Sequence, residues 1–135
     1  MDPHFVGKVA IKAVLVSDNK VLITRSPDDP KWEIPGGRLH QNETVEGALL
    51  REIREELGVT LTLGSVFYLE QYFQGRDGSA HVLITYRVDC PEETVFQPDA
   101  REVCEMRWIT KEELAGYDIH GNCLNALKSH WGIPL

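Results

Sequence analysis

The chain has 135 residues, within the usual range for one domain, and we expect residues 1–135 to form a single domain. An apolar fraction of 42% is enough for a real core, and a net charge of −7 argues against broad nucleic-acid binding, which needs a basic surface. No apolar run is long enough for a transmembrane helix, and the first residues lack the features of a secretion signal. The cysteines are odd in number and widely spaced, which fits reduced thiols in a cytoplasmic protein: Cys90, Cys104 and Cys123.

The N-terminal part of the chain predicts a β-hairpin. Residues 5–16 predict one long strand, residues 17–19 a turn and residues 20–25 the returning strand. A proline-bounded loop then leads to Trp32. Arg25 is a candidate to bind substrate phosphate. Trp32 is a candidate to stack on a base, although packing in the core is the better interpretation of this residue.

A glycine-rich segment precedes the most informative part of the chain. Residues 32–34 predict a short strand, and residues 35–37 predict a tight turn. Consecutive glycines allow the backbone to approach a ligand closely. The carbonyl oxygen of Gly36 is therefore a candidate metal ligand.

Residues 45–57 predict a helix, with Thr44 as the N-cap and Gly58 just past the C-terminus. Apolar residues recur every fourth position and predict a buried stripe: Val45, Leu49, Ile53 and Leu57. Glu52, Glu55 and Glu56 lie on one face beside that stripe, where like charges cost about 0.2–0.5 kcal/mol per pair. A multivalent cation would turn this cost into a gain. Oxygen-only ligation suits Mg²⁺ or Mn²⁺.

The C-terminal half predicts a second hairpin and two further helices. Residues 59–73 are strand-like with a break at Gly64, residues 75–78 predict a turn and residues 80–88 a strand. Tyr72 is a candidate to line a substrate cleft. An acidic loop over residues 90–100 precedes a predicted strand (103–109), a short helix (111–114) and a terminal helix (120–130). This mixed order favours an α/β or α+β sandwich, with a sheet covered by helices.

The stretch from Gly37 to Val59 resembles the signature of the Nudix (MutT-like) hydrolases, G-x5-E-x7-R-E-U-x-E-E-x-G-U, in which U is bulky and aliphatic. Every fixed position matches: Gly37, Glu43, Arg51, Glu52, Ile53, Glu55, Glu56, Gly58 and Val59. The resemblance implies an α/β/α sandwich around a mixed sheet, with a catalytic helix. It also implies hydrolysis of a pyrophosphate bond in a nucleoside diphosphate linked to another moiety, with a divalent cation as cofactor.

The resemblance leaves the substrate open among a nucleoside triphosphate, ADP-ribose and a nucleotide sugar. Residues 74–77, Gln-Gly-Arg-Asp, lack the downstream proline or tyrosine that marks some subfamilies. The alternative is a Nudix-fold module that binds a nucleotide or an RNA 5′ end without catalysis. A monomer and a homodimer are both compatible with the sequence.

The resemblance also implies roles for individual residues. Glu52 and Glu56 would bind the metal, Glu55 would bind it or help to activate water, and Glu43 with Arg51 would form an orienting ion pair. Family members often recruit one more acidic residue late in the chain. We expect Glu102, ahead of Glu105, to be this auxiliary ligand or base, because the alternation along the strand turns Glu105 to the other side.

Overall fold

The computed structural model describes residues 2–73 and 78–135. The strands are β1 (Lys8–Ser17), β2 (Lys20–Arg25), β3 (Gly36–Arg38), β4 (Val66–Phe73), β5 (Ala80–Asp89) and β6 (Glu105–Ile109). The helices are α1 (Val45–Leu57), the 3₁₀ helix η1 (Lys111–Gly116) and α2 (Gly121–Trp131). Within these residues no helix is long and apolar enough to cross a membrane.

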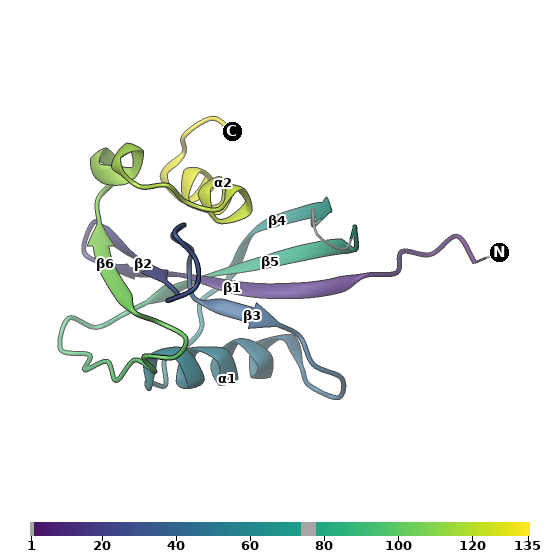
Figure 1. Cartoon of the computed structure of the whole chain (residues 1–135), viewed down its shortest axis with the longest axis horizontal. Helices are drawn as coiled ribbons and strands as arrows, with labels where there is room; N and C mark the ends of the chain where they lie inside the picture. The colour runs from purple at the N-terminus through teal and green to yellow at the C-terminus, as the bar shows by residue number, and fades with distance from the viewer. Residues whose placement is uncertain (1, 74–77) are drawn as a thin grey trace.

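The strands form one mixed sheet in the order β4-β5-β1-β2-β6, and β3 adds to β1. The central pair, β1 and β5, is parallel, whereas the other pairs are antiparallel. Helix α1 covers one face of this sheet, and α2 with η1 covers the other (Figure 1). This arrangement confirms the predicted sandwich of helices around a mixed sheet.

Strand β1 contributes to a core on each face of the sheet. Ile11 and Leu15 pack in the cluster that contains the buried residues of α1, whereas Val14 packs in the cluster under α2. Because side chains alternate across a strand, a strand covered on both faces is apolar at nearly every position. Lys12 breaks this apolar run, and its side chain is only 13% exposed.

The glycine segment differs from the predicted tight turn. Gly36–Arg38 forms β3, which pairs antiparallel with residues 10–12 of β1. The paired positions of β1 and β2 lie at the hairpin turn, Val16 with Val21 and Ser17 with Lys20, so the first half of β1 has a free edge that β3 occupies. Trp32 and Glu33 form isolated bridges rather than a strand.

Other boundaries also differ from the prediction. The first strand starts at Lys8 rather than at residue 5, and the strand after α1 starts only at Val66. Residues 59–65 form a connecting segment without a strand, in which Val59 and Leu61 are buried against the α1-side core. Of the predicted turn over residues 75–78, residues 75–77 lie outside the described residues.

Candidate active site

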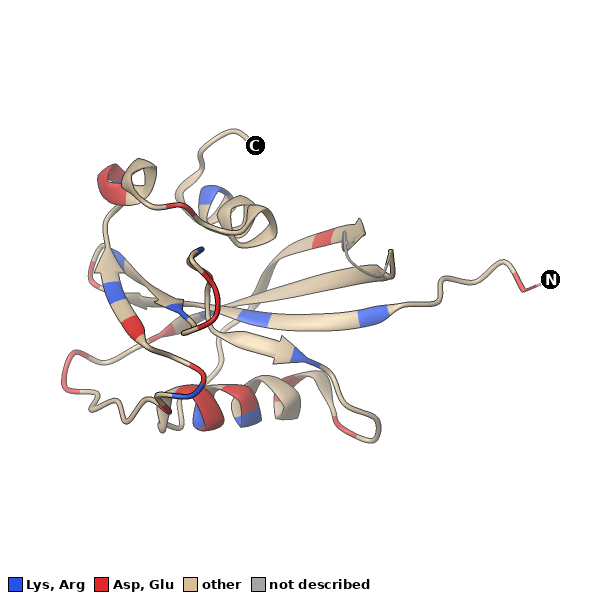
Figure 2. Cartoon of the chain, in the orientation of Figure 1, with Lys and Arg blue, Asp and Glu red and all other residues tan. Residues whose placement is uncertain are grey.

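The three glutamates of interest come from the second half of α1. Thr44 caps the helix by accepting a hydrogen bond from the Gly47 amide (3.0 Å), and Gly58 ends it in the left-handed conformation with φ of 68°. Ala48, Leu49, Ile53 and Leu57 are buried and fix the rotation of the helix on the sheet. Acidic residues lie along α1 and on the segment before β6 (Figure 2).

Strand β3 brings its glycines against the carboxylates of Glu52 and Glu56. The Gly36 amide donates to Oε2 of Glu56 at 3.3 Å. A Cβ atom added to Gly37 would lie 2.4 Å from the carboxyl carbon of Glu52. One added to Gly36 would lie 2.2 Å from the Ile11 carbonyl oxygen, and Gly36 has φ of 140°. Glycine is therefore required here because backbone and carboxylate approach too closely for a side chain.

An arginine organises the other side of the glutamate cluster. Arg51 donates through Nε and Nη2 to the two oxygens of Glu43, at 2.8 and 3.0 Å, in a bidentate ion pair. Its Nη1 donates to Glu52 (3.0 Å) and Glu55 (3.2 Å). The Arg51 hydrogen bonds, with a further one from the His40 amide, lower the pKa of Glu43 to about 2.

Glu56 has the most perturbed acidity in this cluster. Burial raises its pKa to about 8, and the charge of Glu52 adds to the rise, although Lys12 and the Gly36 amide oppose it. The site therefore stabilises a positive charge beside Glu56, supplied by a proton or by a metal ion. Glu52, Glu55 and Glu56 supply carboxylate oxygens, which are hard donors of the kind that Mg²⁺ and Mn²⁺ favour. Among the described residues, however, one atom from each of these three side chains does not lie within 4.8 Å of the others.

The loop before β6 packs on the C-terminal end of α1 and brings Glu102 near the cluster. The amide of Gln97 donates to the Leu57 carbonyl (2.8 Å), and that of Asp99 donates to the Glu56 carbonyl (3.0 Å). Burial raises the pKa of the Glu102 carboxyl, and the charges of Asp99, Glu52 and Glu55 raise it further. The Glu102 carboxyl therefore lies close enough to Glu52 and Glu55 to interact with their charges.

Glu105 has a different environment. It pairs with Arg25 across β6 and β2, and the Arg25 Nε donates to Oε1 of Glu105 at 2.8 Å. Arg107 contributes a weaker contact of 3.4 Å. The same Arg25 guanidinium donates to the Asp29 carbonyl at 3.0 Å, so it holds the loop over residues 26–31 against β6.

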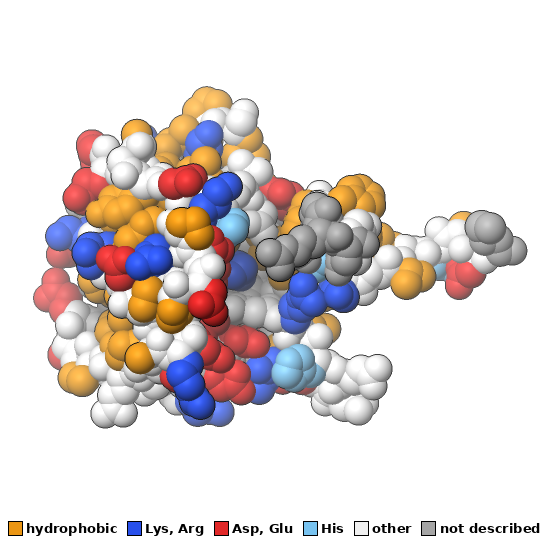
Figure 3. Space-filling view, viewed as in Figure 1, with side chains coloured by type: hydrophobic (Ala, Val, Ile, Leu, Met, Phe, Trp, Pro, Cys, Tyr) orange, Lys and Arg blue, Asp and Glu red, His pale blue; other side chains and the backbone are white. Residues whose placement is uncertain are grey.

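A pocket of about 610 Å³ lies on the α2 side of the sheet. Its wall includes Tyr72 from β4 and a set of polar side chains that the sequence did not single out: Lys12, Asp29, Glu33, Glu70, His120, Asn122 and Asn125. In the view of Figure 3, acidic side chains lie beside a hollow in the surface. Of these pocket residues, Lys12 is the one that the sequence could have indicated, since it is a charged residue inside an apolar strand.

Lys12 lies between this pocket and the glutamate cluster. Its Nζ donates to the Ile34 carbonyl (3.1 Å) and lies 3.7 Å from Glu33. Burial lowers the pKa of the ammonium, but the surrounding acidic groups, among them Glu33 and Glu56, raise it by more. Lys12 is therefore a fixed positive charge at the junction of pocket and cluster.

The three predicted substrate contacts lie in different surroundings. Tyr72 lines the pocket and stacks on His81, with ring centroids 5.0 Å apart. Trp32 packs edge-on against Tyr117 at 5.4 Å, in the cluster under α2. Neither Trp32 nor Arg25 lies in the wall of this pocket, as far as the described residues form it.

Comparison with known proteins agrees with this geometry. The model of the NUDIX domain matches residues 7–127. The CTP pyrophosphohydrolase of Escherichia coli K12 is 28% identical over 114 residues, which cover 81% of this chain and 80% of that protein. The 8-oxo-dGTP diphosphatase of Proteus vulgaris is 44% identical over 61 residues, 41% of this chain and 54% of its own length. The chain thus spans about half the length of that relative.

Solved structures show the same fold. The E. coli ORF135 protein superimposes with a TM-score of 0.78 at 25% identity, covering 93% of this chain and 89% of that one. The E. coli dihydroneopterin triphosphate pyrophosphohydrolase gives 0.76 at 18% identity, over 93% and 96% of the two chains. With the family model matching most of the chain, the protein belongs to the NUDIX family.

Proposed function

We propose that the protein hydrolyses a pyrophosphate bond of a nucleoside triphosphate with the help of Mg²⁺. The observation that carries this proposal is the junction at Lys12, where the glutamate cluster of α1 meets the 610 Å³ pocket. A nucleotide has two parts that such a site accommodates, phosphates beside the cations and a base in the pocket. Relatives named as a CTP pyrophosphohydrolase and a nucleoside triphosphatase support this choice of substrate.

The metal would be held by Glu52, Glu55 and Glu56, with the Gly36 carbonyl as a further candidate ligand. When bound, Mg²⁺ neutralises phosphate charge and acidifies water. Mn²⁺ has similar ligand preferences and is expected to substitute.

The other residues of the site have supporting roles in this proposal. Glu102 accepts the proton of the attacking water, because its raised pKa makes it a better base than an ordinary carboxylate. The bidentate pair of Arg51 and Glu43 orients the glutamates. Lys12 offers its ammonium to the phosphates, and Tyr72 offers its ring to the base. Water adds to one phosphorus atom, and pyrophosphate leaves with the displaced oxygen, so the products are a nucleoside monophosphate and pyrophosphate.

A substrate panel tests this proposal. Nucleoside triphosphates, ADP-ribose, nucleotide sugars and dinucleoside polyphosphates are incubated with Mg²⁺, Mn²⁺, Ca²⁺ or excess chelator, and the products are resolved by chromatography. We expect a nucleoside monophosphate and pyrophosphate from a triphosphate. Ca²⁺ should substitute poorly, because it is larger and less exacting in geometry than Mg²⁺.

Each other outcome has a distinct meaning. Turnover in excess chelator would refute the metal requirement. Faster hydrolysis of ADP-ribose or a nucleotide sugar would refute the substrate class. Nucleotide binding without turnover would identify a binding module instead of an enzyme of this class. Cytoplasmic location, the single-domain organisation and the choice between monomer and homodimer stay predictions.

A further inference from the structure

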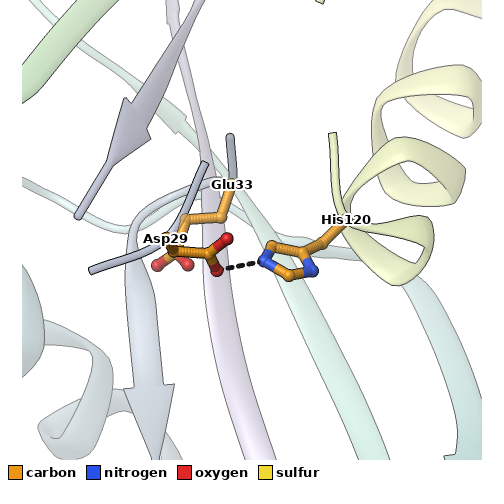
Figure 4. Close-up of side chains that lie close together, drawn as sticks. All are labelled: Asp29, Glu33 and His120. Carbon is orange, nitrogen blue, oxygen red and sulfur yellow. Dashed lines mark hydrogen bonds and ion pairs between the residues drawn. The ribbon is translucent and has the colours of Figure 1, made fainter. Parts of the chain in front are cut away.

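The pocket wall carries a second group of metal-ligating side chains, apart from the glutamates of α1. One oxygen each from Asp29 and Glu33 and one ring nitrogen of His120 all lie within 4.8 Å of one another (Figure 4). The three residues come from the loop before Trp32, from the bridge to β2 and from the residue before α2. All three side chains line the same pocket.

Backbone hydrogen bonds hold these segments together without any ligand. The Trp32 amide donates to the Asp118 carbonyl (2.8 Å), and the His120 amide donates to the Trp32 carbonyl (3.0 Å). Glu33 and Thr24 exchange two backbone hydrogen bonds, each of 2.8 Å. The positions from which Glu33 and His120 project are therefore fixed by the fold, as a preformed site requires.

The side chains are also directed for ligation. Nε2 of His120 lies 2.5 Å from Oδ2 of Asp29, while the other Asp29 oxygen accepts a hydrogen bond from the Lys31 amide (2.9 Å). Oε1 of Glu33 lies 3.7 Å from the Lys12 ammonium, beyond hydrogen-bond distance, so it retains lone pairs for another ligand. An ion pair between Asp29 and His120 alone would be enough to attach the loop to α2. It would not account for the Glu33 carboxylate beside them, which a metal site does.

The local charge favours a cation. Asp29, Glu33 and Glu70 supply three carboxylates to the pocket wall, and Lys12 supplies one ammonium group. Two carboxylates with one imidazole form a mixed oxygen and nitrogen donor set. Such a set suits Zn²⁺, which binds imidazole and carboxylate at about 2.0–2.2 Å, whereas Mg²⁺ and Ca²⁺ favour oxygen alone.

We propose that Asp29, Glu33 and His120 bind a transition-metal cation of the zinc class in the pocket, separately from the glutamates of α1. The cation takes the place of the hydrogen bond between the His120 ring and Asp29. The proposal does not depend on the substrate, because the ligands are preformed in the free chain.

Calorimetric titration of the full chain with Zn²⁺ tests this site. The buffer contains excess Mg²⁺ to occupy the α1 glutamates. The chain carries Cys104→Ser, because Cys104 is an exposed thiol and thiolates are zinc ligands. We expect one Zn²⁺ per chain. His120→Ala and Glu33→Gln should each weaken binding by at least about tenfold. His130→Ala is the matched control, since it removes a half-buried histidine of α2 away from the pocket wall, and it should retain binding.

Several results would overturn the proposal. These are no Zn²⁺ binding in the presence of Mg²⁺, binding unchanged by His120→Ala and Glu33→Gln, an equal loss in His130→Ala, or loss in His120→Ala with none in Glu33→Gln. Thermal melting checks that each variant is folded. If His120→Ala does not fold, Glu33→Gln alone decides, because its backbone hydrogen bonds with Thr24 remain.

Discussion

Replacing Gly37 by alanine would separate the geometry of the metal site from the stability of the fold. The added methyl would lie 2.4 Å from the Glu52 carboxyl carbon, where ordinary contact begins at 3.4 Å, so the carboxylate must move by about 1 Å. A misplacement of that size can cost about 10²-fold in rate, and Mg²⁺ demands near-octahedral ligand geometry. We therefore expect kcat to fall about 10²-fold, which corresponds to about 2.7 kcal/mol of barrier. Because the displaced group is the end of a flexible side chain, the melting temperature should change little.

The neighbouring glycine provides the contrast. In Gly36→Ala the methyl would meet the Ile11 carbonyl oxygen of β1 at 2.2 Å, and φ of 140° disfavours any side chain, so the melting temperature should fall clearly. Gly116→Ala, which meets nothing within 4 Å, is the control for both. The assays are steady-state kinetics with Mg²⁺ titration, and thermal melting. Wild-type kcat in Gly37→Ala would refute the proposed position of Glu52 at the metal. Unfolding of this variant would refute the expectation that the fold tolerates the added methyl.

Three further predictions concern the carboxylates. Glu56→Gln should remain folded and lose at least about 10² in kcat. Glu46→Gln, near the start of α1, should retain activity. Normal kcat in Glu56→Gln would exclude Glu56 as a metal ligand. Glu102→Gln should lose between about 10² and 10⁴ in kcat at saturating metal, and more than Glu105→Gln does; the reverse order would move the auxiliary role to Glu105. In metal-free protein the folded-state pKa of Glu56 is raised from 4.5 to about 8, so stability should fall as pH rises through this range, because the folded state then binds more protons than the unfolded state. Melting curves recorded in chelator from about pH 5 to about pH 9 should show that fall in stability in the wild type and a smaller fall in Glu56→Gln. Parallel curves for the two proteins would contradict this prediction.

Helix α1 was predictable from sequence because its signals are local. The N-cap Thr44, the αL residue Gly58 and the apolar stripe lie within the helix or next to it, and the structure ends α1 at the predicted residues. The pairing of Glu43 with Arg51 was likewise expected from the motif, and the structure shows its bidentate form.

Strand β3 and the pocket were not predictable in the same way. Whether Gly36–Arg38 becomes a turn or a strand depends on the free edge of β1, which is a property of the assembled sheet. Asp29 and His120 are 91 positions apart, and only the packing of α2 brings them together. Sequence periodicity carries no information on such distances. Alternation along the predicted strand was the reason to turn Glu105 to the other side, because alternation depends only on the period of a strand. The choice of Glu102 as the auxiliary residue stays a prediction.

The parallel pairing of β1 with β5 has a consequence for how the enzyme acquires activity during folding. It joins Lys8 to His81 and continues to Val16 and Asp89, so nine pairs close a loop that contains β3 and α1. The β1–β2 and β4–β5 hairpins involve short separations and should form early, whereas this long closure is entropically slow. Catalytic competence should thus appear only with the last cooperative step of refolding, so that recovery of turnover reports completion of the central sheet.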